Sequence, residues 1–444
     1  MESKLFDLRD LLIGANFLLL VIVGTIVYGW FVRDRKEKLL FSFNIIVSVT
    51  FAVAYGVAYY FYYGGGDTFA YWDGAIKLNN LLFYDPGAYI DEMLTTSIEG
   101  GQYKNFNSIT GYPPPWIYRE GESFFVSKIF SFLGLLTFNS YVATSIVIGF
   151  ISGVITWKFY KSIAISLQIS HWKIGFSILF IPSVSFWCNG ISKDTLLLLF
   201  LFLFLIIVFN TIGNNIKFNW QSFFKIMIVS YLIFSVRPFM LIAILIPLAI
   251  VLFSGVLKRI AGSRLWLLYF LRLSSFVFIV TIVMSSFQFL GVTSINNSSY
   301  VKQAVVTHND FKENKTYKGK RYSIGLTDSS VIGIISTFPL AIFAAFYRPL
   351  IFEANNLFFL LTAIEGSIFL MLSILLFFKN KGIYNNGKYI LSNTVLSFSL
   401  YFCLIYGFIV GFTSILLGVL VRFKAPLLPF LLLILLAALF RENK

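Results

Sequence analysis

The sequence contains few charged residues, and this shortage limits the classes of protein it can belong to. Only 12% of the 444 residues are Asp, Glu, Lys or Arg, whereas 58% are hydrophobic, and the mean hydropathy is +0.82. So small a polar fraction cannot coat a water-soluble fold of this size. The composition therefore excludes a soluble globular protein and predicts a chain whose main solvent is lipid.

Cysteine and histidine are also scarce, with two residues of each. Cys188 and Cys403 lie in or at the edge of apolar segments, and their spacing is not that of metal ligands. His308 falls in a polar stretch, where we expect it to be exposed. The sequence shows no repeat of the length found in solenoids and no Gly/Ser linker, so repeat architectures are excluded as well.

Long apolar runs dominate the sequence. Barrel strands would alternate over about ten residues, whereas these runs approach the length of a membrane helix of about 20 residues. They are Leu11 to Val32, Leu39 to Tyr62, Leu196 to Phe209, Phe239 to Leu257, Leu357 to Phe378 and Leu427 to Phe440. We therefore expect an all-α, polytopic transmembrane bundle over residues 1–444, with about 11 to 13 membrane helices.

The positions of the basic residues predict the topology. The net charge is +15, but the cations cluster in short connectors such as Arg33 to Lys38, which is typical of cytoplasmic loops and not of nucleic-acid binding. The first run lacks a basic segment before it and a cleavage site after it, so we expect a retained helix. We expect the N-terminus outside and the C-terminus in the cytoplasm of a bacterial inner membrane.

Two loops and two short apolar segments refine this topology. Residues 63–122 form a predicted outer loop, whose stretch from Gly64 to Glu122 has eight acidic and three basic residues. Residues 291–330 form a basic outer loop, which we expect either to cover a polyanionic donor or to serve as a solvated, mobile lid. Ser123 to Phe138 and Val331 to Tyr347 are short or interrupted, and we expect interfacial or re-entrant helices there.

Several charged residues adjoin the predicted spans at the outer face. An unpaired charge is costly there, so such a group indicates a functional site. The residues are Asp67, Asp73, Lys193, Asp194, Arg237, Arg348, Arg422 and Lys424. Two further carboxylates, Glu353 and Glu365, lie at or within apolar segments, and Glu365 needs a cationic partner.

Asp67 follows three glycines directly after the second apolar run. Glycines permit a sharp turn and a close approach to a ligand, and an aspartate held there can accept a hydroxyl proton or coordinate a divalent cation beside a phosphate. The alternative is that Asp67 only caps a helix over Thr68 to Leu82. The metal, if any, stays unknown from the sequence, and Asp73 is a second catalytic candidate.

The basic candidates suit an anionic ligand. Arg237, Arg348 and the Arg422–Lys424 pair each precede a proline that can begin a helix, and arginine binds phosphate through two parallel hydrogen bonds. Lys193 and Asp194 fit a short polar turn, either as a site or as a helix cap. Snorkelling to lipid phosphates is the simpler explanation for each arginine taken alone.

These residues resemble the landmarks of a known family. Asp67, Tyr71 and Ala75, the turn ending in Asp194, the Arg237-Pro238 corner and the segment Arg422 to Pro429 are similar to those of the integral-membrane GT-C glycosyltransferases and of bacterial surface-polysaccharide membrane proteins. The resemblance implies a polyprenyl-phosphate-linked sugar donor, a glycan, lipid or protein acceptor, a catalytic base at Asp67 and a lipid-phosphate clamp from the basic corners. Asp67-Thr68 stands where the family usually has an acidic pair.

Three functions are therefore compatible with the sequence. The first is glycosyl transfer at the outer face, with polymerisation or ligation of lipid-linked oligosaccharides as a close variant. The second is a flippase or transporter, which would place polar groups at the bilayer midplane in two related halves. The third is a non-catalytic component of an export assembly. Tyr71, Trp72, Trp116 and Tyr118 are candidates for stacking on a glycan.

Overall fold

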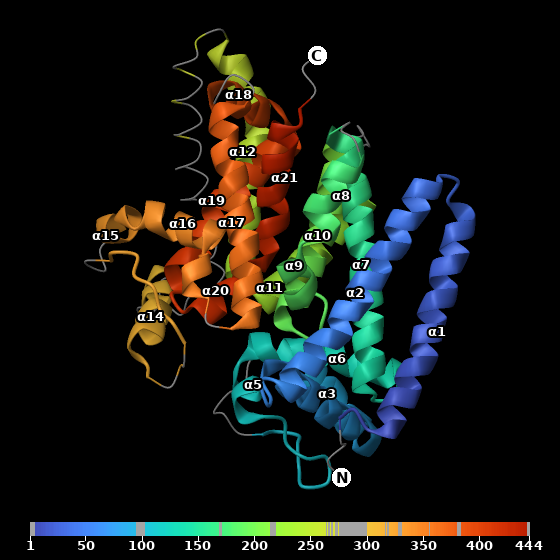
Figure 1. Cartoon of the computed structure of the whole chain (residues 1–444). Coiled ribbons are helices and arrows are strands. Elements are labelled where there is room, and N and C mark those ends of the chain that lie inside the picture. Colours follow the sequence, from blue (N-terminus) through green and yellow to red (C-terminus); the bar gives the residue numbers. More distant parts are fainter. Residues whose placement is uncertain are drawn as a thin grey trace. The chain divides into compact units, whose positions relative to one another are not determined.

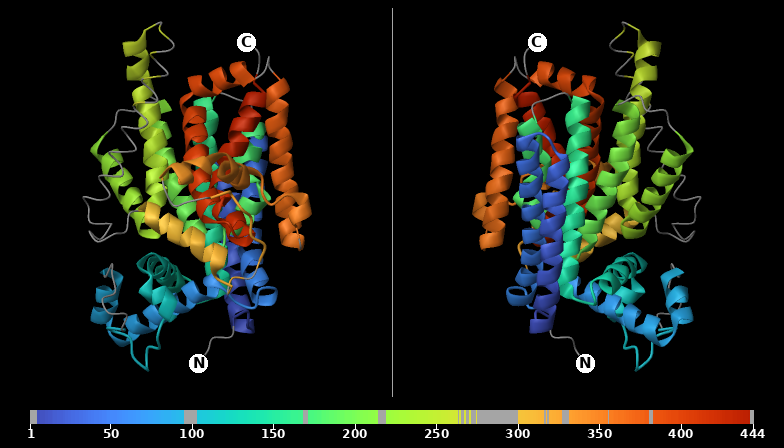
Figure 2. Two further views of the ribbon diagram at one scale, coloured as in Figure 1. Left: turned by 90° about the vertical axis from the view of Figure 1, so that its left-hand side faces the viewer. Right: turned by 90° about the vertical axis from the view of Figure 1, so that its right-hand side faces the viewer.

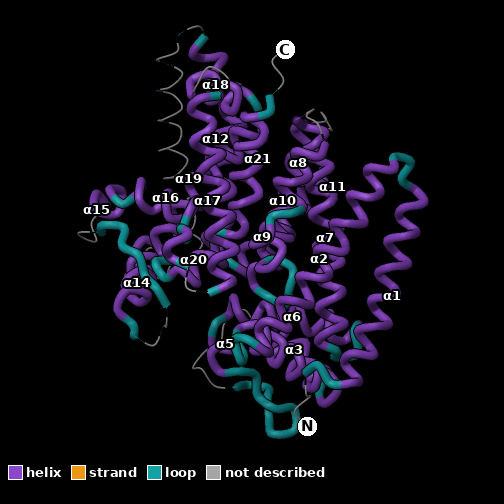
Figure 3. The backbone as a smooth tube through the Cα atoms, in the orientation of Figure 1, coloured by secondary structure: helices purple, strands orange, loops and turns teal. Residues whose placement is uncertain are grey.

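The computed structural model is helical throughout the part of the chain that it describes. That part comprises residues 5–94, 103–167, 171–213, 219–262, 300–315, 319–326, 331–354, 356–379 and 383–441, with the single positions 264, 267, 270, 274 and 317. The only extended pairing in these ranges is one isolated bridge between Arg321 and Leu416, and Figure 3 shows helices and loops alone. The all-α prediction is confirmed.

The chain divides into two compact units. Unit 1 contains Met1–Ser162 and Leu179–Pro238, and unit 2 contains Ile163–Ile178 and Phe239–Lys444. Helix α7 (Tyr141–Leu167) begins in unit 1 and ends in unit 2. Figure 1 labels the elements along the chain.

Unit 1 is built on long apolar helices. They are α1 (Leu8–Phe31), α2 (Arg35–Phe61), α7, α10 (Lys193–Gly213) and α11 (Trp220–Val236). The α1, α2 and α7 helices run side by side (Figure 2), and the buried Asn44 of α2 donates to the Gly153 carbonyl of α7 at 2.7 Å. A buried amide needs such a partner, so this bond fixes the pairing of α2 with α7.

A group of shorter helices follows the end of α2 near Phe61 (Figures 1 and 2). They are α3 (Asp67–Tyr84), α4 (Pro86–Leu94), α5 (Pro115–Arg119) and α6 (Gly121–Leu136), and the short α9 (Pro182–Trp187) completes unit 1. Helix α3 packs along α6, where the Ser131 hydroxyl donates to Asn79 Oδ1 at 2.5 Å. The described residues from α3 to α6 therefore form a folded helical layer and not an open loop.

Lys128 is a buried cation inside this layer, with 6% of its surface exposed. Its ammonium donates to the Met93 carbonyl at 3.4 Å and lies 5.3 Å from the centre of the Phe124 ring. Burial lowers the pKa of Lys128 to about 8, and nearby Glu92 opposes that shift. The Tyr118 hydroxyl and the Asn105 amide both donate to Glu92, so the group holds the segment before α5 against α4.

Unit 2 is also helical. Its elements are α8 (His171–Leu179), which ends at the start of unit 1's second segment, α12 (Pro238–Ala261), which begins at the last residue of unit 1, α14 (Tyr300–Glu313), α15 (Val331–Ser336), α16 (Phe338–Tyr347), η2 (Ile351–Glu353), α17 (Leu357–Phe378), α18 (Ile383–Ser392), α19 (Thr394–Thr413), α20 (Leu417–Phe423), η3 (Ala425–Leu427) and α21 (Leu428–Leu439). The α19 helix packs against α14, α16, α18 and α21. A Cβ on Gly411 would lie 2.0 Å from the Ala341 carbonyl oxygen, so glycine permits the close contact of α16 with α19.

Seven helical segments of the described residues are long and apolar enough to cross a membrane. They are Leu8–Phe31, Arg35–Phe61, Tyr141–Leu167, Lys193–Thr211, Phe359–Phe378, Thr394–Thr413 and Leu417–Leu439. Four shorter apolar helices accompany them: Gly175–Trp187, Trp220–Val236, Pro238–Ser254 and Phe338–Tyr347. The chain therefore has the helices of a membrane protein, although fewer reach full length than the sequence predicted.

The two segments expected to be interfacial or re-entrant are indeed short helices. Residues 123–138 fall mostly in α6, which has 16 residues. Residues 331–347 break at Thr337 into α15 and α16, of 6 and 10 residues. A helix rises about 1.5 Å per residue, so neither α15 nor α16 alone spans a hydrocarbon layer about 30 Å thick.

Candidate functional site

Asp67 is the first residue of α3 and stands on a glycine turn. Gly64, Gly65 and Gly66 have φ values of +67°, +133° and +138°, which L side chains rarely adopt. Gly66 is the N-cap residue of α3, so Asp67 lies in the first helical turn, where a carboxylate interacts favourably with the helix dipole. The side chain is partly exposed. This placement fits the alternative that Asp67 is a favourable anion at the helix N-terminus, although the N-cap position itself belongs to Gly66.

A ladder of tyrosines leads along α2 to this turn. Tyr55, Tyr59 and Tyr63 are spaced four residues apart, and their successive ring centres lie 4.7 and 5.0 Å from each other. A Cβ on Gly66 would lie 2.6 Å from Tyr59 Cε1, and the Gly65 amide donates to the Tyr59 carbonyl at 3.0 Å. The ladder therefore fixes the glycine turn from one side.

The last tyrosine of the ladder is also the most exposed. Tyr63 has 44% of its surface accessible, whereas Tyr55 has none. Partial burial, with neighbouring Tyr59 and Tyr62, raises the pKa of Tyr63 to about 12. Its hydroxyl therefore stays protonated at neutral pH and is able to donate a hydrogen bond beside the Asp67 turn.

The other end of the ladder contacts the turn between α9 and α10. A Cβ on Gly190 would lie 2.2 Å from Tyr55 Cδ1, so glycine is required for this contact. Ser192 accepts a hydrogen bond from the Thr195 amide at 3.1 Å, as a helix N-cap does, and donates to the Trp187 carbonyl at 3.3 Å. Lys193 and Asp194 are consequently the first two residues of α10, which agrees with the prediction that Asp194 suits the start of the next helix.

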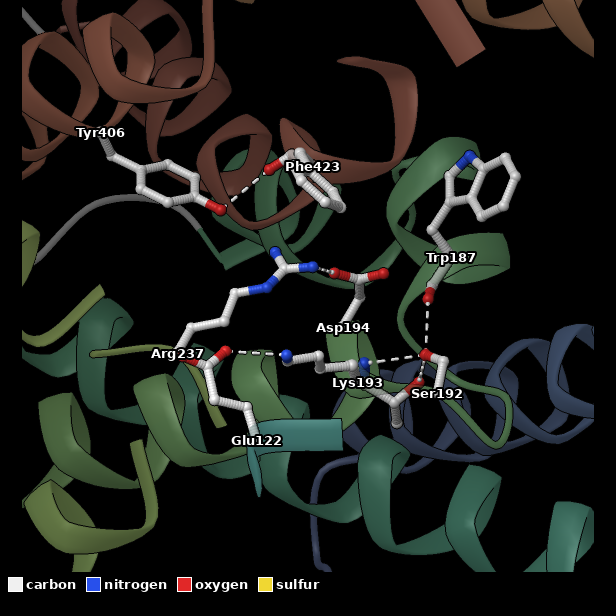
Figure 4. Close-up of polar contacts among 9 residues, drawn as sticks. Glu122, Trp187, Ser192, Lys193, Asp194, Arg237, Tyr406 and Phe423 are labelled. Carbon is white, nitrogen blue, oxygen red and sulfur yellow. Dashed lines mark hydrogen bonds and ion pairs between the residues drawn. The ribbon is translucent and has the colours of Figure 1, made fainter. Parts of the chain in front are cut away.

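Two ion pairs form at the start of α10 (Figure 4). Arg237 Nη2 lies 2.7 Å from Asp194 Oδ1, and these side chains are only 5% and 0% exposed. Lys193 Nζ lies 2.8 Å from Glu122 Oε2, with exposures of 11% and 42%. The structure thus brings together three predicted residues, Lys193, Asp194 and Arg237, and adds Glu122 from the first turn of α6. Nothing in the sequence near Glu122 singled it out as a partner.

Arg237 confirms part of the predicted corner geometry. It is the C-cap residue of α11, and α12 begins at the following residue, Pro238. The side chain pairs with a carboxylate and is not an open phosphate clamp. An arginine has five N–H donors in a planar fork, and the pair with Asp194 uses Nη2 of that fork.

Arg348 and Lys424 are brought together in unit 2. The Lys424 ammonium is 1% exposed and donates to the Arg348 carbonyl at 2.6 Å. Arg348 Nε lies 3.4 Å from Glu353 Oε1, and its guanidinium lies 4.9 Å from the centre of the Tyr322 ring. Glu365 lies within electrostatic range of Lys424, so a cation accompanies this carboxylate, as the sequence predicted.

The predicted proline corners of unit 2 differ from that of Arg237. No α-helix begins at Pro349. The element that follows Arg348 is instead the short 3-10 helix η2. Arg422 lies within α20, one residue before its end, and Pro426 lies inside η3. Tyr406 donates to the Phe423 carbonyl at 2.9 Å and so ties the end of α20 to α19 (Figure 4).

His308 is buried, contrary to the expectation that it is exposed. Only 3% of its surface is accessible, and its Nδ1 lies 2.8 Å from the Phe412 carbonyl oxygen. Burial lowers the pKa of His308, so the ring is neutral at physiological pH. The histidine anchors α14 to the end of α19. Lys318 and Asp328 of the basic 291–330 segment, and its first nine residues, lie outside the described residues.

The surroundings of Asp73 and of the predicted stacking residues show which of them a substrate can reach. Asp73 is on the surface of α3, 47% exposed, and lies 3.5 Å from Lys77 Nζ one helical turn away. Tyr71, Trp72 and Tyr118 are at most 3% exposed, so these three cannot stack on a glycan. Trp116, at 50% exposure, remains able to do so.

No group of three or more His, Cys, Asp and Glu side chains suited to a metal ion occurs within the described ranges. A cation bound by Asp67 would accordingly complete its shell with water or with substrate oxygens, as Mg²⁺ usually does.

Comparisons with protein-family models, with curated proteins and with solved structures find no match for this chain. The class that the structure itself defines is therefore a helical membrane protein with charged residues paired at helix ends.

Proposed function

We propose that this chain is a membrane glycosyltransferase that moves a sugar from a polyprenyl-phosphate-linked donor to an acceptor hydroxyl on the outer face. The observation that carries the proposal is the backbone turn immediately before Asp67. Three consecutive glycines with positive φ, of which Gly66 packs against Tyr59 of the tyrosine ladder, precede a partly exposed carboxylate at the first turn of α3. A backbone of this conformation is costly for most residues, and such features are concentrated at functional sites.

The proposed reaction inverts the anomeric carbon. The acceptor hydroxyl oxygen attacks that carbon, and its proton passes to the Asp67 carboxylate. The bond between the anomeric carbon and the phosphate oxygen breaks, and its electron pair leaves with the lipid phosphate. Positive groups stabilise the charge that develops on the leaving phosphate.

Unit 1 supplies further groups for this chemistry. The α3 helix, which begins with Asp67, packs along α6, and the first turn of α6 carries Glu122, which pairs with Lys193. Asp194 holds Arg237 in a buried pair. We assign to Lys193 and Arg237 the binding of an anionic substrate group, and to Asp73 and Asp194 an orienting role. Arg348, Arg422 and Lys424 are phosphate-binding candidates within unit 2.

The proposal includes the finer topology. We infer about 11 to 13 membrane helices, with the N-terminus outside, the C-terminus in the cytoplasm and the layer from α3 to α6 on the outer face of a bacterial inner membrane. The acidic balance of residues 64–122 and the basic connectors, such as Arg33 to Lys38, support this orientation.

A turnover assay tests the function. The purified chain in lipid is supplied with labelled polyprenyl-phosphate and polyprenyl-pyrophosphate sugars and with candidate acceptors. Wild-type protein should release lipid phosphate with transfer of label, and Asp67→Asn should slow transfer roughly 10²- to 10⁴-fold, the usual contribution of a general base. Thermal unfolding of this variant should match that of wild type.

Asp85→Asn is the matched control. Asp85 is exposed, and its Oδ1 accepts hydrogen bonds from the Gly87 and Ala88 amides at 2.9 and 3.1 Å. Asparagine caps helices about as well as aspartate, so activity should be unchanged. Full activity in Asp67→Asn would remove the base assignment. Donors that bind but stay intact would instead favour the flippase or export-assembly alternatives.

A further inference from the structure

Three cationic residues from separate segments of unit 2, Lys320, Arg348 and Lys424, are linked through the backbone of Arg348 and of Glu353. Lys320 precedes the Arg321–Leu416 bridge and donates to the Glu353 carbonyl at 3.1 Å. Lys424 donates to the Arg348 carbonyl at 2.6 Å. We call Lys320, Arg348, Glu353 and Lys424, with Tyr322, the Arg348 corner. Like charges repel one another. The presence of three cationic residues in one corner therefore needs a reason beyond packing.

Backbone and side-chain hydrogen bonds hold the Arg348 corner in place. The Tyr322 hydroxyl donates to the Gly411 carbonyl at 2.9 Å, and its amide donates to the Ile415 carbonyl at 3.0 Å. The Leu417 amide in turn donates to the Lys320 carbonyl at 3.0 Å. The Tyr322 ring therefore has a fixed place under the Arg348 guanidinium, and the buried Lys424 fixes the Arg348 backbone.

Arg348 itself is incompletely satisfied. Its Nε makes no hydrogen bond to any of the described residues, and the Glu353 oxygen at 3.4 Å lies beyond the usual 2.7–3.2 Å range. A guanidinium with unused donors is costly where it is largely buried. Nε itself is buried, but about a quarter of the side chain, 24%, is exposed, so an external anion reaches Arg348 at its exposed part and not at Nε.

Glu353 is the group that partly neutralises Arg348 in this structure. One carboxylate oxygen, Oε2, accepts a short 2.8 Å hydrogen bond from the Leu350 amide, and the other faces Arg348 at the longer distance. The carboxylate is thus held by its own 3-10 turn and only loosely by the arginine. An anion with better geometry can replace it as the partner of Arg348.

We propose that the Arg348 corner is a binding site for a phosphate group, with Glu353 as the internal anion that the phosphate displaces from Arg348. Arg348 and Lys320 bind the phosphate oxygens, while Lys424 and Tyr322 position Arg348. Phosphate suits this site because a planar guanidinium can donate two parallel hydrogen bonds to it.

The position of the corner in the chain favours a lipid headgroup as the source of the phosphate. Glu353 comes six residues before the candidate span Phe359–Phe378, and Arg348 directly follows the shorter apolar helix Phe338–Tyr347. Ends of spans lie at the level of lipid headgroups. The choice of a polyprenyl phosphate as probe rests on the proposed function, but the test measures binding and not turnover.

The experiment is a binding titration of the purified full chain in nanodiscs made of uncharged lipid. The probes are farnesyl phosphate, farnesol and inorganic phosphate. Wild type should bind farnesyl phosphate more tightly than farnesol. Arg348→Gln should weaken farnesyl phosphate binding by about tenfold or more and leave farnesol unchanged, because a charge-assisted bidentate contact is lost.

Glu353→Gln distinguishes this site from a purely structural ion pair. The glutamine amide oxygen can still accept from Leu350, but the competing charge is removed, so farnesyl phosphate should bind about three- to tenfold more tightly. A structural pair would show no gain. Glu313→Gln, at the exposed end of α14, is the charge-matched control and should change nothing. Lys320→Gln, on an exposed residue, reports on the site if Arg348→Gln fails to fold.

The outcomes are separable. Weaker binding in Arg348→Gln with tighter binding in Glu353→Gln supports the site even if no sugar transfer is ever detected. Arg348-dependent binding of inorganic phosphate without farnesyl phosphate binding supports the phosphate site and assigns its ligand to a soluble source. Equal loss of farnesol and farnesyl phosphate in Arg348→Gln, or an unchanged affinity in Glu353→Gln, would overturn the proposal.

Discussion

At the scale of single residues, buried charge is the strongest constraint on this chain. Arg237 and Asp194 are nearly inaccessible and lie 2.7 Å apart. Removing one member of a buried pair leaves an uncompensated charge, whereas replacing both is far less costly. The pair therefore sets the joint position of the α11 end and the α10 start.

Arg237→Met should therefore destabilise the protein by about 3 to 5 kcal/mol. The double variant Arg237→Met with Asp194→Asn should recover much of that loss, since no buried charge remains. Lys77→Met, which breaks the exposed pair with Asp73, should cost about 0 to 1 kcal/mol. Thermal unfolding in one detergent measures all three, and simple additivity of the two buried substitutions would contradict the coupling.

Which residues carry charge was visible in the sequence, but which residues pair was not. Lys193, Asp194 and Arg237 were identifiable because charges beside apolar segments are costly. Glu122 and Tyr322 were not, since their roles arise from contacts between segments far apart in sequence. The burial of His308 was missed for the same reason: its carbonyl partner belongs to Phe412.

At the scale of elements, hydropathy predicts long helices well and short ones poorly. The run Leu357 to Phe378 coincides with α17, because composition alone defines a continuous apolar helix. Of the layer from α3 to α6, helices over Thr68 to Leu82 and Ser123 to Phe138 were expected, and they fall within α3 and mostly within α6. Helices such as α4 and α5 have 9 and 5 residues, and tertiary packing decides helices of that length.

The glycine turn before α3 provides a prediction at this scale. Gly66→Ala should destabilise the turn and lower Asp67-dependent transfer, because φ is +138° and the new Cβ would lie 2.6 Å from the Tyr59 ring. Gly64→Ala is the control: its φ of +67° is the left-handed helical region and no atom lies within 4 Å of its Cβ, so the cost should be about 1 to 2 kcal/mol. Unfolding temperature and turnover of both variants are the measurements.

Equal behaviour of the two glycine variants would show that Tyr59 does not define the turn. A loss of turnover in Gly66→Ala at an unchanged unfolding temperature would be the most informative result. It would mean that the geometry of the turn around Asp67, and not overall stability, limits the reaction.

At the scale of the whole molecule, topology determines where any chemistry takes place. The basic connector between α1 and α2 and the acidic segment after α2 should lie on opposite sides of the membrane. Both native cysteines are buried, each 1% exposed. Because the sequence has two cysteines, Cys188→Ser with Cys403→Ser yields a chain without thiols. Single reporter cysteines are then placed in that chain.

Ser108→Cys, at an exposed position before α5, should react with a membrane-impermeant maleimide on intact cells. Lys36→Cys and Lys388→Cys, exposed in α2 and α18, should react only after the membrane is opened. Because α2 is one candidate span, Lys36 and Ser108 must differ if that helix crosses the membrane. Reaction of all three on intact cells would contradict the predicted orientation. Protection of Ser108→Cys alone would move Asp67 to the cytoplasmic face, where an outer-face transfer reaction is impossible.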